Sequence, residues 1–302
     1  MADNIARGIA AEEVAEALAE HGVPRVVAAR LVASSARSPE LEPARRQAER
    51  ARRLALVLEL QKRHRAFAAG IERIAAPEPE TFFARYYANL VPVVLTDLTA
   101  SWPALRRWSM SDLRERFGAV EIEACSGRDG DPMPDLNFAA HRERMTVAEL
   151  VDRIAADSGN DLYLIANNHA LDGPLRALLD DIEAPAYCAG LPEPGNASLW
   201  VGGAGTRTPL HLCDGVVGRP RCALVPPREE PLLEAPRGYD ATMTVESVAQ
   251  RYEVELGPGD TLFLPVGWWH EVVALTPSIS ISLLNFVRAN HFPWYAPGGS
   301  HV

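Results

Sequence analysis

The sequence has few cysteines, no excess of basic residues and no long apolar run. Four cysteines in 302 residues, without a Cys-x-x-Cys pair, argue against a disulfide scaffold and a structural zinc site. A formal net charge of −10 disfavours a nucleic-acid partner, which needs a basic surface. No window approaches the roughly 18 to 20 apolar residues of a membrane span. The N-terminal segment is acidic and lacks the apolar region of a secretory signal, so we expect a cytoplasmic protein with no membrane partner.

What is present divides into two parts. Residues 1–67 are rich in Ala, Glu, Arg and Leu and predict a helical region, with helices over 10–20, 25–35 and 43–67. From residue 68 to 302 short β-branched and apolar runs alternate with turn signals, as in VPVVLTDL, VEIEAC and ISISLLNF. Many short strands indicate a mainly β domain with helices, of the sandwich or jelly-roll type. The predicted strands cover 91–98, 120–125, 162–166, 197–203, 222–225, 254–256, 261–264, 271–274 and 279–286.

Two segments place a histidine near the end of a predicted strand. They are TPLHLCD, with His211, and PGDTLFLPVGWWHEV, with His270. A histidine, a nearby carboxylate and a distant second histidine on barrel strands can bind Fe(II) on one side and leave the other side open. One such segment is weak evidence, because a single histidine is usually a hydrogen-bonded structural residue. Two of them favour a metal site or the remnant of one.

The stretch from residue 71 to 297, which includes both segments, resembles the cupin-like JmjC family of Fe(II)/2-oxoglutarate oxygenases. The matching pieces, in the family's order, are VPVVLTDLTASWPALRRWS, NDLYLIANN, LWVGGAGTRTPLH, VPP, LGPGDTLFLPVGWWHEV and SISISLLNF. The resemblance implies a double-stranded β-helix in which a His-x-Asp motif and a later histidine hold the metal. It makes His211 and His270 the two imidazole ligands, with Fe(II) and 2-oxoglutarate as cofactors.

The sequence departs from the family's pattern in one stretch. Cys213 stands where the family has its aspartate, and Asp214 follows one residue later. Only six residues, 212–217, separate His211 from Gly218, fewer than in the family. Pro220 stands where the family has the lysine that binds 2-oxoglutarate. Three ligand sets therefore stay open: Asp214 as third ligand, Cys213 as third ligand with a preference for Zn or Cu, or no competent third ligand.

A cation for 2-oxoglutarate can still come from arginine, which binds carboxylates through a bidentate fork. Because strand side chains alternate between faces, a one-residue slip would turn Arg219 or Arg221 inward in place of Pro220. The same slip would match the displacement of the carboxylate from position 213 to 214. We therefore expect Arg219 or Arg221 to bind the cosubstrate, with loss of function as the alternative.

Further pocket residues follow from the resemblance. Thr208 and Tyr163 match residues that hydrogen-bond the cosubstrate, and Asn285 matches a polar residue of the same pocket. Asn167, next to Asn168, and Trp268, next to Trp269, are candidates for contact with a substrate. Each residue also has a purely structural alternative. Tyr163 could be a strand tyrosine with a satisfied hydroxyl, and Asn285 could bond to the backbone. Loop capping is the alternative for the two neighbouring asparagines, and core packing is the alternative for at least one of the two tryptophans.

The leading hypothesis from the sequence is a hydroxylase that couples decarboxylation of 2-oxoglutarate to hydroxylation of a C–H bond. Its substrate would be a peptide or protein side chain, an amino acid or a small natural product. The main rival is a cupin barrel that has lost this chemistry and works as a metal-independent or differently metallated enzyme, a binding module or a pseudoenzyme. A third class, a subunit of a homodimer held by the helical leader, also stays open.

Overall fold

The computed structural model of the chain describes most of the β domain and part of the helical leader. The described residues are 4–5, 9–39, 41, 43, 47, 51, 54, 70–131, 134–135, 137–165, 168–190, 197–212, 216–217, 220–226 and 250–288. The backbone divides into two compact units, 1–62 and 63–302. The boundary expected after residue 67 falls in a stretch outside the described residues. None of the helices described is long and apolar enough to cross a membrane.

The first unit contains a pair of helices, α2 (Ala11–Glu20) and α3 (Arg25–Ala36). Gly22, with φ of +89°, lies in the turn between them, a backbone conformation that favours glycine. Val14 of α2 and Val32 of α3 pack together in a small apolar cluster. The two predicted helices are thus confirmed, whereas the third, over 43–67, falls mostly outside the described residues.

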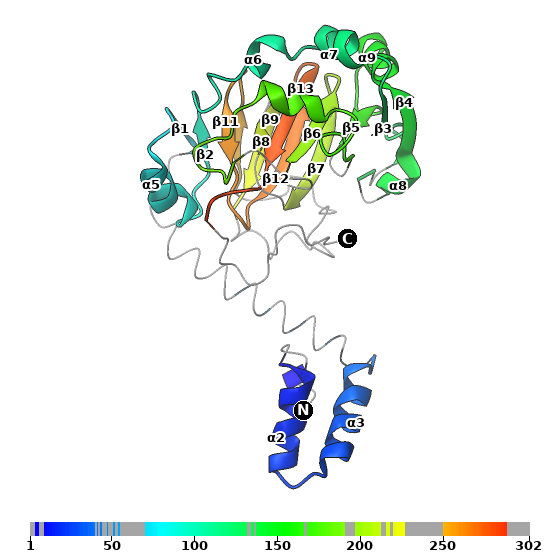
Figure 1. The fold of residues 1–302 in the computed structure, drawn as a ribbon, viewed down its shortest axis with the longest axis vertical. Helices are drawn as coiled ribbons and strands as arrows, with labels where there is room; N and C mark the ends of the chain where they lie inside the picture. Colours follow the sequence, from blue (N-terminus) through cyan, green and yellow to red (C-terminus); the bar gives the residue numbers. More distant parts are fainter. Residues whose placement is uncertain are drawn as a thin grey trace. The chain divides into compact units, whose positions relative to one another are not determined.

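The second unit is built on two sheets that carry its strands (Figure 1). In the described part of the chain the larger sheet has nine strands in the order β1-β2-β11-β8-β13-β6-β5-β3-β4, and only β1 and β2 pair in parallel. Its strands are β1 Glu72–Ile74, β2 Val93–Leu95, β3 Glu121–Cys125, β4 Arg142–Thr146, β5 Tyr163–Leu164, β6 Ala197–Gly202, β8 Val216–Val217, β11 Thr261–Phe263 and β13 Ser278–Leu283.

The smaller sheet has the order β10-β9-β12-β7, and its pairs are antiparallel. Its strands are β7 Arg207–Leu212, β9 Pro220–Val225, β10 Tyr252–Glu255 and β12 Trp269–Ala274. Each predicted strand range overlaps an observed strand, and the predicted mainly β, jelly-roll fold with helices is confirmed. The two sheets meet through side chains such as Tyr163 of β5 and Thr208 of β7, whose hydroxyl oxygens are 3.4 Å apart.

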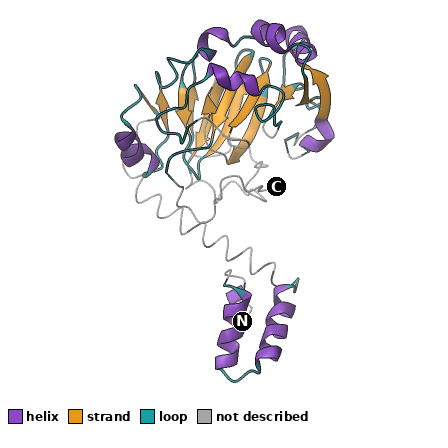
Figure 2. Ribbon diagram, in the orientation of Figure 1, coloured by secondary structure: helices purple, strands orange, loops and turns teal. Residues whose placement is uncertain are grey.

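Helices lie around the sheets, as Figure 2 shows with the strands grouped in the middle. They are α5 Pro79–Phe82, η2 Phe83–Tyr87, α6 Ala104–Arg107, α7 Met110–Phe117, α8 Phe138–His141, α9 Val147–Ala156 and η3 Arg176–Asp181. α9 begins with a capping box, in which Thr146 Oγ1 accepts from the Glu149 N–H and the Glu149 carboxylate accepts from the Thr146 N–H. Its buried face, with Leu150 and Ile154, joins the main apolar core.

Strands β6 and β13 show why the two faces of the larger sheet differ. Leu199 and Ile281 point to the outer face and belong to the core under the helices. The next residue on each strand, Trp200 on β6 and Ser280 on β13, lies on the opposite, inner face, and these two are cross-strand partners. This inner face is polar at β6 and β13, which leaves room for a polar site inside the barrel.

Several elements carry too weak a sequence signal to be predicted. β1 and β4 have exposed, charged residues and gain their strand conformation from pairing with β2 and β3. The helix that begins as α5 continues as the π-helical turn η2. In each case long-range packing decides the backbone, and local propensity does not.

A buried carboxylate fastens η3 to the helices beside it. Asp181 is fully buried and accepts from Arg107 at 2.6 Å, from Arg116 at 2.6 Å and from the Trp108 indole at 3.1 Å. Burial of Asp181 opposes ionisation, but the donated hydrogen bonds hold the pKa of this carboxyl below its ordinary value. The ionised carboxylate therefore joins α6, α7 and η3 over the outer face of the sheet.

Replacing Asp181 by Asn should destabilise the protein by about 2 kcal/mol, because one partner of a buried ionic cluster is lost. Urea unfolding at pH 7 measures the change. Asp112→Asn, which removes only the i,i+4 pair with Arg116, is the matched control and should cost no more than about 0.5 kcal/mol. Equal effects of the two substitutions would refute the structural role assigned to Asp181.

Candidate metal and cosubstrate site

The two predicted metal ligands lie on neighbouring strands of the smaller sheet. β7 and β12 pair antiparallel, and the register places His211 directly opposite His270. His270 is buried, with 1% of its surface exposed. Cross-strand partners in an antiparallel pair share one face of the sheet with their Cβ atoms roughly 5 Å apart. Two imidazoles from such positions can bind one metal ion.

A bulge in β7 sets which residues share the face of His270. His270 and Val272 are two residues apart on β12, whereas their partners, His211 and Thr208, are three apart on β7. Without the extra residue, positions 208 and 211 would lie on opposite faces. The bulge therefore brings positions 208 and 211 to one side of the sheet. The sequence alone does not reveal it, because it depends on the pairing of segments about 60 residues apart.

The third ligand is outside the part of the chain that the structure describes. Both candidates, Asp214 and Cys213, fall in the stretch 213–215. Among the described residues, no three His, Cys, Asp or Glu side chains come together as a metal site. The observed pairing of the two histidine positions fits two of the three protein ligands of a facial triad.

The expected cosubstrate residues, Tyr163 and Thr208, come together. Both are buried, and their hydroxyl oxygens lie 3.4 Å apart across the two sheets. Trp200 lies beside this pair, with its ring centroid 6.0 Å from that of Tyr163. Its indole N–H donates to Ser282 Oγ at 3.4 Å. Tyr163, Trp200 and Ser282 belong to the larger sheet and Thr208 to the smaller one, so a polar ligand between the sheets would find hydrogen-bond donors and acceptors here.

A glycine allows Tyr163 to lie against the neighbouring strand. Gly202 is the cross-strand partner of Tyr163, and a Cβ atom at Gly202 would be 2.8 Å from Tyr163 Cδ2 and 2.6 Å from Thr206 Oγ1. Any larger residue would push the ring away. Burial raises the pKa of Tyr163 to about 12, so the phenol is a neutral hydrogen-bond donor at physiological pH.

A buried arginine, which the sequence does not single out, lies beside Tyr163. Arg128 is completely buried, and its guanidinium carbon lies 5.5 Å from the centroid of the Tyr163 ring. It pairs with Asp135 at 2.6 Å and donates to the carbonyl of Arg207 at 3.0 Å. It stands in a polar loop, SGRDGD, where nothing in the sequence separates it from exposed arginines.

Comparison with known proteins identifies the barrel. The family model described as a cupin-like domain matches residues 79–286, about two thirds of the chain. The chain belongs to the cupin-like domain family. Within that family it is a JmjC-type cupin, as its relatives show, and the resemblance found in the sequence is confirmed.

Three curated proteins are similar to this chain over most of its length. They are Lysine-specific demethylase 8 of Xenopus tropicalis at 28% identity, Jumonji C domain-containing protein 5 of Drosophila melanogaster at 27% and Lysine-specific demethylase JMJ30 of Arabidopsis thaliana at 29%. Each match covers 70% of this cupin and 52%, 59% and 54% of the relative, respectively. The chain thus spans little more than half the length of these curated relatives.

The orientation of strand β9 shows that the expectation of an inward-facing Arg221 is wrong. Pro220 is buried and pairs with Ala274 of β12, whereas Arg221 is exposed and pairs with Val273. In this JmjC-type cupin the proline therefore faces the interior and Arg221 faces outward, so the expected one-residue slip of β9 is not observed. The other candidate, Arg219, lies outside the described residues.

Two other expected pocket residues have structural contacts instead. Trp268 is buried among apolar side chains, and its indole donates to the carbonyl of Leu90 at 2.9 Å. Asn285 donates from Nδ2 to the carbonyl of Gly190 at 3.0 Å. The structure thus places Trp268 in the core and gives the Asn285 amide group a backbone contact. These are the structural alternatives for the two residues, and a role of either one in ligand binding stays a prediction.

Of the two neighbouring asparagines, one falls outside the described residues and one caps a loop. Asn167 is outside the part described. Asn168 donates to the carbonyl of Leu199 at 2.7 Å and accepts from the N–H of Ala170 at 2.8 Å, so its side chain is occupied by backbone groups. Loop capping, the structural alternative for this residue, is what the structure shows.

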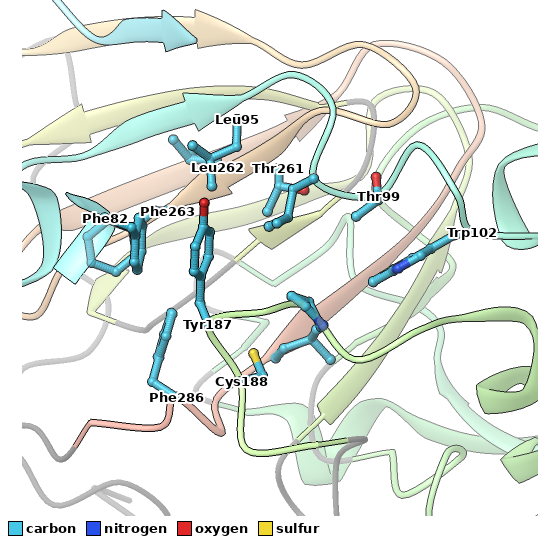
Figure 3. Close-up of a pocket in the computed structure, with 13 residues that line it drawn as sticks. Phe82, Leu95, Thr99, Trp102, Tyr187, Cys188, Thr261, Leu262, Phe263 and Phe286 are labelled. Atoms are coloured by element: carbon cyan, nitrogen blue, oxygen red, sulfur yellow. The ribbon is translucent and has the colours of Figure 1, made fainter. Parts of the chain in front are cut away.

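A second, apolar pocket lies on the other face of the larger sheet (Figure 3). Phe82, Tyr187 and Phe263 form its aromatic side, with the rings of Phe82 and Tyr187 stacked at 4.0 Å. Cys188 also lines it, and burial raises the pKa of this thiol to about 11. The pocket offers no metal ligand set, so the polar interior of the barrel is the better candidate for chemistry.

Tyr163→Phe should reduce the loss of stability at high pH. The unfolded phenol has a pKa of about 10, whereas burial raises the folded value to about 12. The stability contributed by the neutral phenol is complete below pH 10 and is lost as the pH rises toward 12. Wild type should therefore lose about 1 kcal/mol more than the variant between pH 9.5 and 11, measured by urea unfolding. Parallel curves would contradict the burial of this hydroxyl.

Proposed function

We propose that this JmjC-type cupin is an Fe(II)/2-oxoglutarate-dependent hydroxylase. The observation that carries the proposal is the register of β7 and β12, which pairs His211 with His270 and sets Thr208 on the same side of the sheet. Two histidines from paired strands, with buried hydroxyl groups beside them, suit a metal that binds an oxo acid. The family comparison supports the same chemistry, because JmjC proteins include enzymes of this class.

The roles of the chain's own residues follow from their positions. His211 and His270 would hold the metal together with Asp214, or with Cys213 in the alternative ligand set. Tyr163 and Thr208 would donate hydrogen bonds to a carboxylate of the oxo acid, since both hydroxyls are buried and face each other. When bound, Fe(II) and 2-oxoglutarate supply oxygen activation, with succinate and CO₂ as by-products. Burial between the two sheets keeps water from the hydroxyls of Tyr163 and Thr208.

The substrate class is part of the proposal. Two of the relatives are named as lysine-specific demethylases, but this chain spans only about half of each. A side chain of a peptide or protein fits the family, and an amino acid or a small natural product is the alternative. The net charge of −10 favours a cationic or neutral substrate over an anionic one.

The second candidate function is a cupin barrel without oxygenase chemistry. The observation that favours it is Pro220, which is buried at an inward-facing position of β9 and offers no charge to a cosubstrate. Such a barrel would bind a ligand, or a different metal through Cys213, without consuming 2-oxoglutarate.

Addition of Fe(II) and 2-oxoglutarate under nitrogen should produce a weak visible charge-transfer band. Air should then release succinate. Asp214→Ala should abolish the band if Asp214 is the third ligand, while Cys213→Ala leaves it in place. The reverse result assigns Cys213. His270→Ala is the positive control for loss of the band. No band and no succinate from the wild-type protein would favour the non-oxygenase barrel.

A second prediction uses the inward position of Pro220. Pro220→Lys should tighten 2-oxoglutarate binding by roughly tenfold, because the added ammonium group would face the interior and can pair with a carboxylate. Arg221→Lys, at the neighbouring exposed position, is the matched control and should change the dissociation constant less than about twofold. Tryptophan fluorescence titration with Mn(II) in place of Fe(II) measures both. No difference between the two variants would remove 2-oxoglutarate from the proposed site.

A further inference from the structure

The apolar pocket on the outer face of the larger sheet takes no part in the proposed function (Figure 3). It lies between two parts of the core. Trp102 and Leu283 on its wall belong to the main apolar core, whereas Phe82, Tyr187 and Phe263 belong to an aromatic cluster beside α5. The space between the walls is about 480 Å³, with its open mouth included. Pockets that bind small molecules have volumes of roughly 300 to 1,000 Å³.

A gap between two core clusters lowers the stability of a protein unless something fills it. Protein interiors are packed as densely as organic crystals, and side chains that line a void lose the contacts that a neighbour would provide. Ordered water is a poor filling, because each water molecule needs two to four polar partners and these walls are mainly apolar. An apolar cavity therefore stays dry or takes up an apolar guest.

The hydroxyl groups of the described lining are already bonded or covered. Thr99 donates to the carbonyl of Gly259 at 2.9 Å, and Tyr187 donates to the carbonyl of Pro77 at 2.6 Å. Thr261 Oγ1 is buried within the wall, where a ligand does not reach it. None of the described lining residues carries a charged side chain, so an ionised ligand would find no counter-charge here.

The aromatic side of the pocket favours a flat ring. Phe82 stacks on Tyr187 with ring centroids 4.0 Å apart, and Phe263 meets Phe82 edge to face at 5.0 Å. The Trp102 indole lies across the space from these rings, and the Cys188 sulfur points between the two sides (Figure 3). Aromatic rings gain attraction beyond the burial of their area when they pack offset or edge to face. A ring bound here would gain such contacts from both sides.

We propose that this pocket is a binding site for an uncharged, apolar molecule built on one aromatic ring. Its lining offers ring contacts and no charge, and it lies on the face of the larger sheet that is turned away from Tyr163 and Trp200. The inference does not depend on the proposed function, so either one can fail while the other stands.

The first test compares toluene with benzoate, a charged molecule of similar size. Toluene should bind with a dissociation constant of roughly 1 mM or lower, measured by titration calorimetry, and should raise the melting temperature. Benzoate should bind at least roughly tenfold more weakly, because its carboxylate would lose hydration without gaining a partner. Benzoate that binds as tightly as toluene would overturn the uncharged class of ligand.

Octan-1-ol tests the preference for a ring over a flexible chain. It should bind at least roughly tenfold more weakly than toluene, because a chain makes no ring contacts and loses more conformational freedom on binding. Octan-1-ol that binds more tightly than toluene would assign the pocket to an alkyl chain and overturn the proposal.

Alkylation of Cys188 reports where toluene binds. This thiol lines the pocket, so toluene should slow its reaction with N-ethylmaleimide in proportion to the fraction of protein bound, as followed by peptide mapping. Cys125 is the matched control, because it lies on β3 beside the carbonyl of Phe138, outside this pocket. Its rate should not change. Toluene that binds without slowing the reaction of Cys188 would be bound elsewhere, which refutes the site.

Two variants fill the pocket and one leaves it open. Cys188→Phe and Leu98→Phe each place a ring in the space, from the loop before β6 and from the loop after β2, and should abolish both toluene binding and the rise in melting temperature. Cys188→Ala is the matched control and should change the dissociation constant less than about threefold, because it removes a single sulfur contact.

Toluene binding that survives in a folded Phe variant, or that is absent from the wild type, refutes the site. The alkylation rate of Cys188 in the wild type gives the answer if neither Phe variant folds.

Discussion

The antiparallel pairing of β7 with β12 is the constraint on which the candidate site depends. It puts His211 opposite His270, and its bulge restores Thr208 to the same side. A slip of one residue would turn every side chain of β7 to the other face. The slip is opposed by the outer face as well, where Arg207 is paired with Glu271. The polar interior and the charged exterior of one strand thus specify the same register.

The fold could be predicted largely from local patterns, and the site only in part. Alternation in ISISLLNF and the capping box at Thr146 depend on neighbouring residues, so the sequence shows them directly. The His211–His270 pair was expected from the family pattern. The β7 bulge was not, since it becomes visible only when residues 208–211 are paired with 270–272. Arg128 was missed for the same reason: its burial comes from Asn160, Arg207 and Asp135, which are scattered along the sequence.

The positions of Trp268 and Arg221 were hard to predict from the sequence for the same physical reason. Trp268 precedes Trp269 and His270, and which of these side chains faces the interior cannot be decided before the strand's register is known. In the structure Trp268 packs with Leu224 and Cys222, the β9 partners of His270 and Val272, so it fills the interior as a core residue with its indole against the carbonyl of Leu90. For β9 the sequence displacement from position 213 to 214 suggested a slip. The burial of Pro220 and the exposure of Arg221 show that the strand keeps the register that turns the proline inward.

The buried Arg128–Asp135 pair gives the start of β7 a second fixed point. Arg128 donates to the carbonyl of Arg207, the residue before Thr208, and Asn160 Oδ1 accepts from the Arg207 N–H. The position of Thr208 beside Tyr163 therefore depends on the loop that carries Arg128 as well as on the pairing of β7 with β12. A loop held by a buried ion pair and the register of a strand thus act on the same side chain.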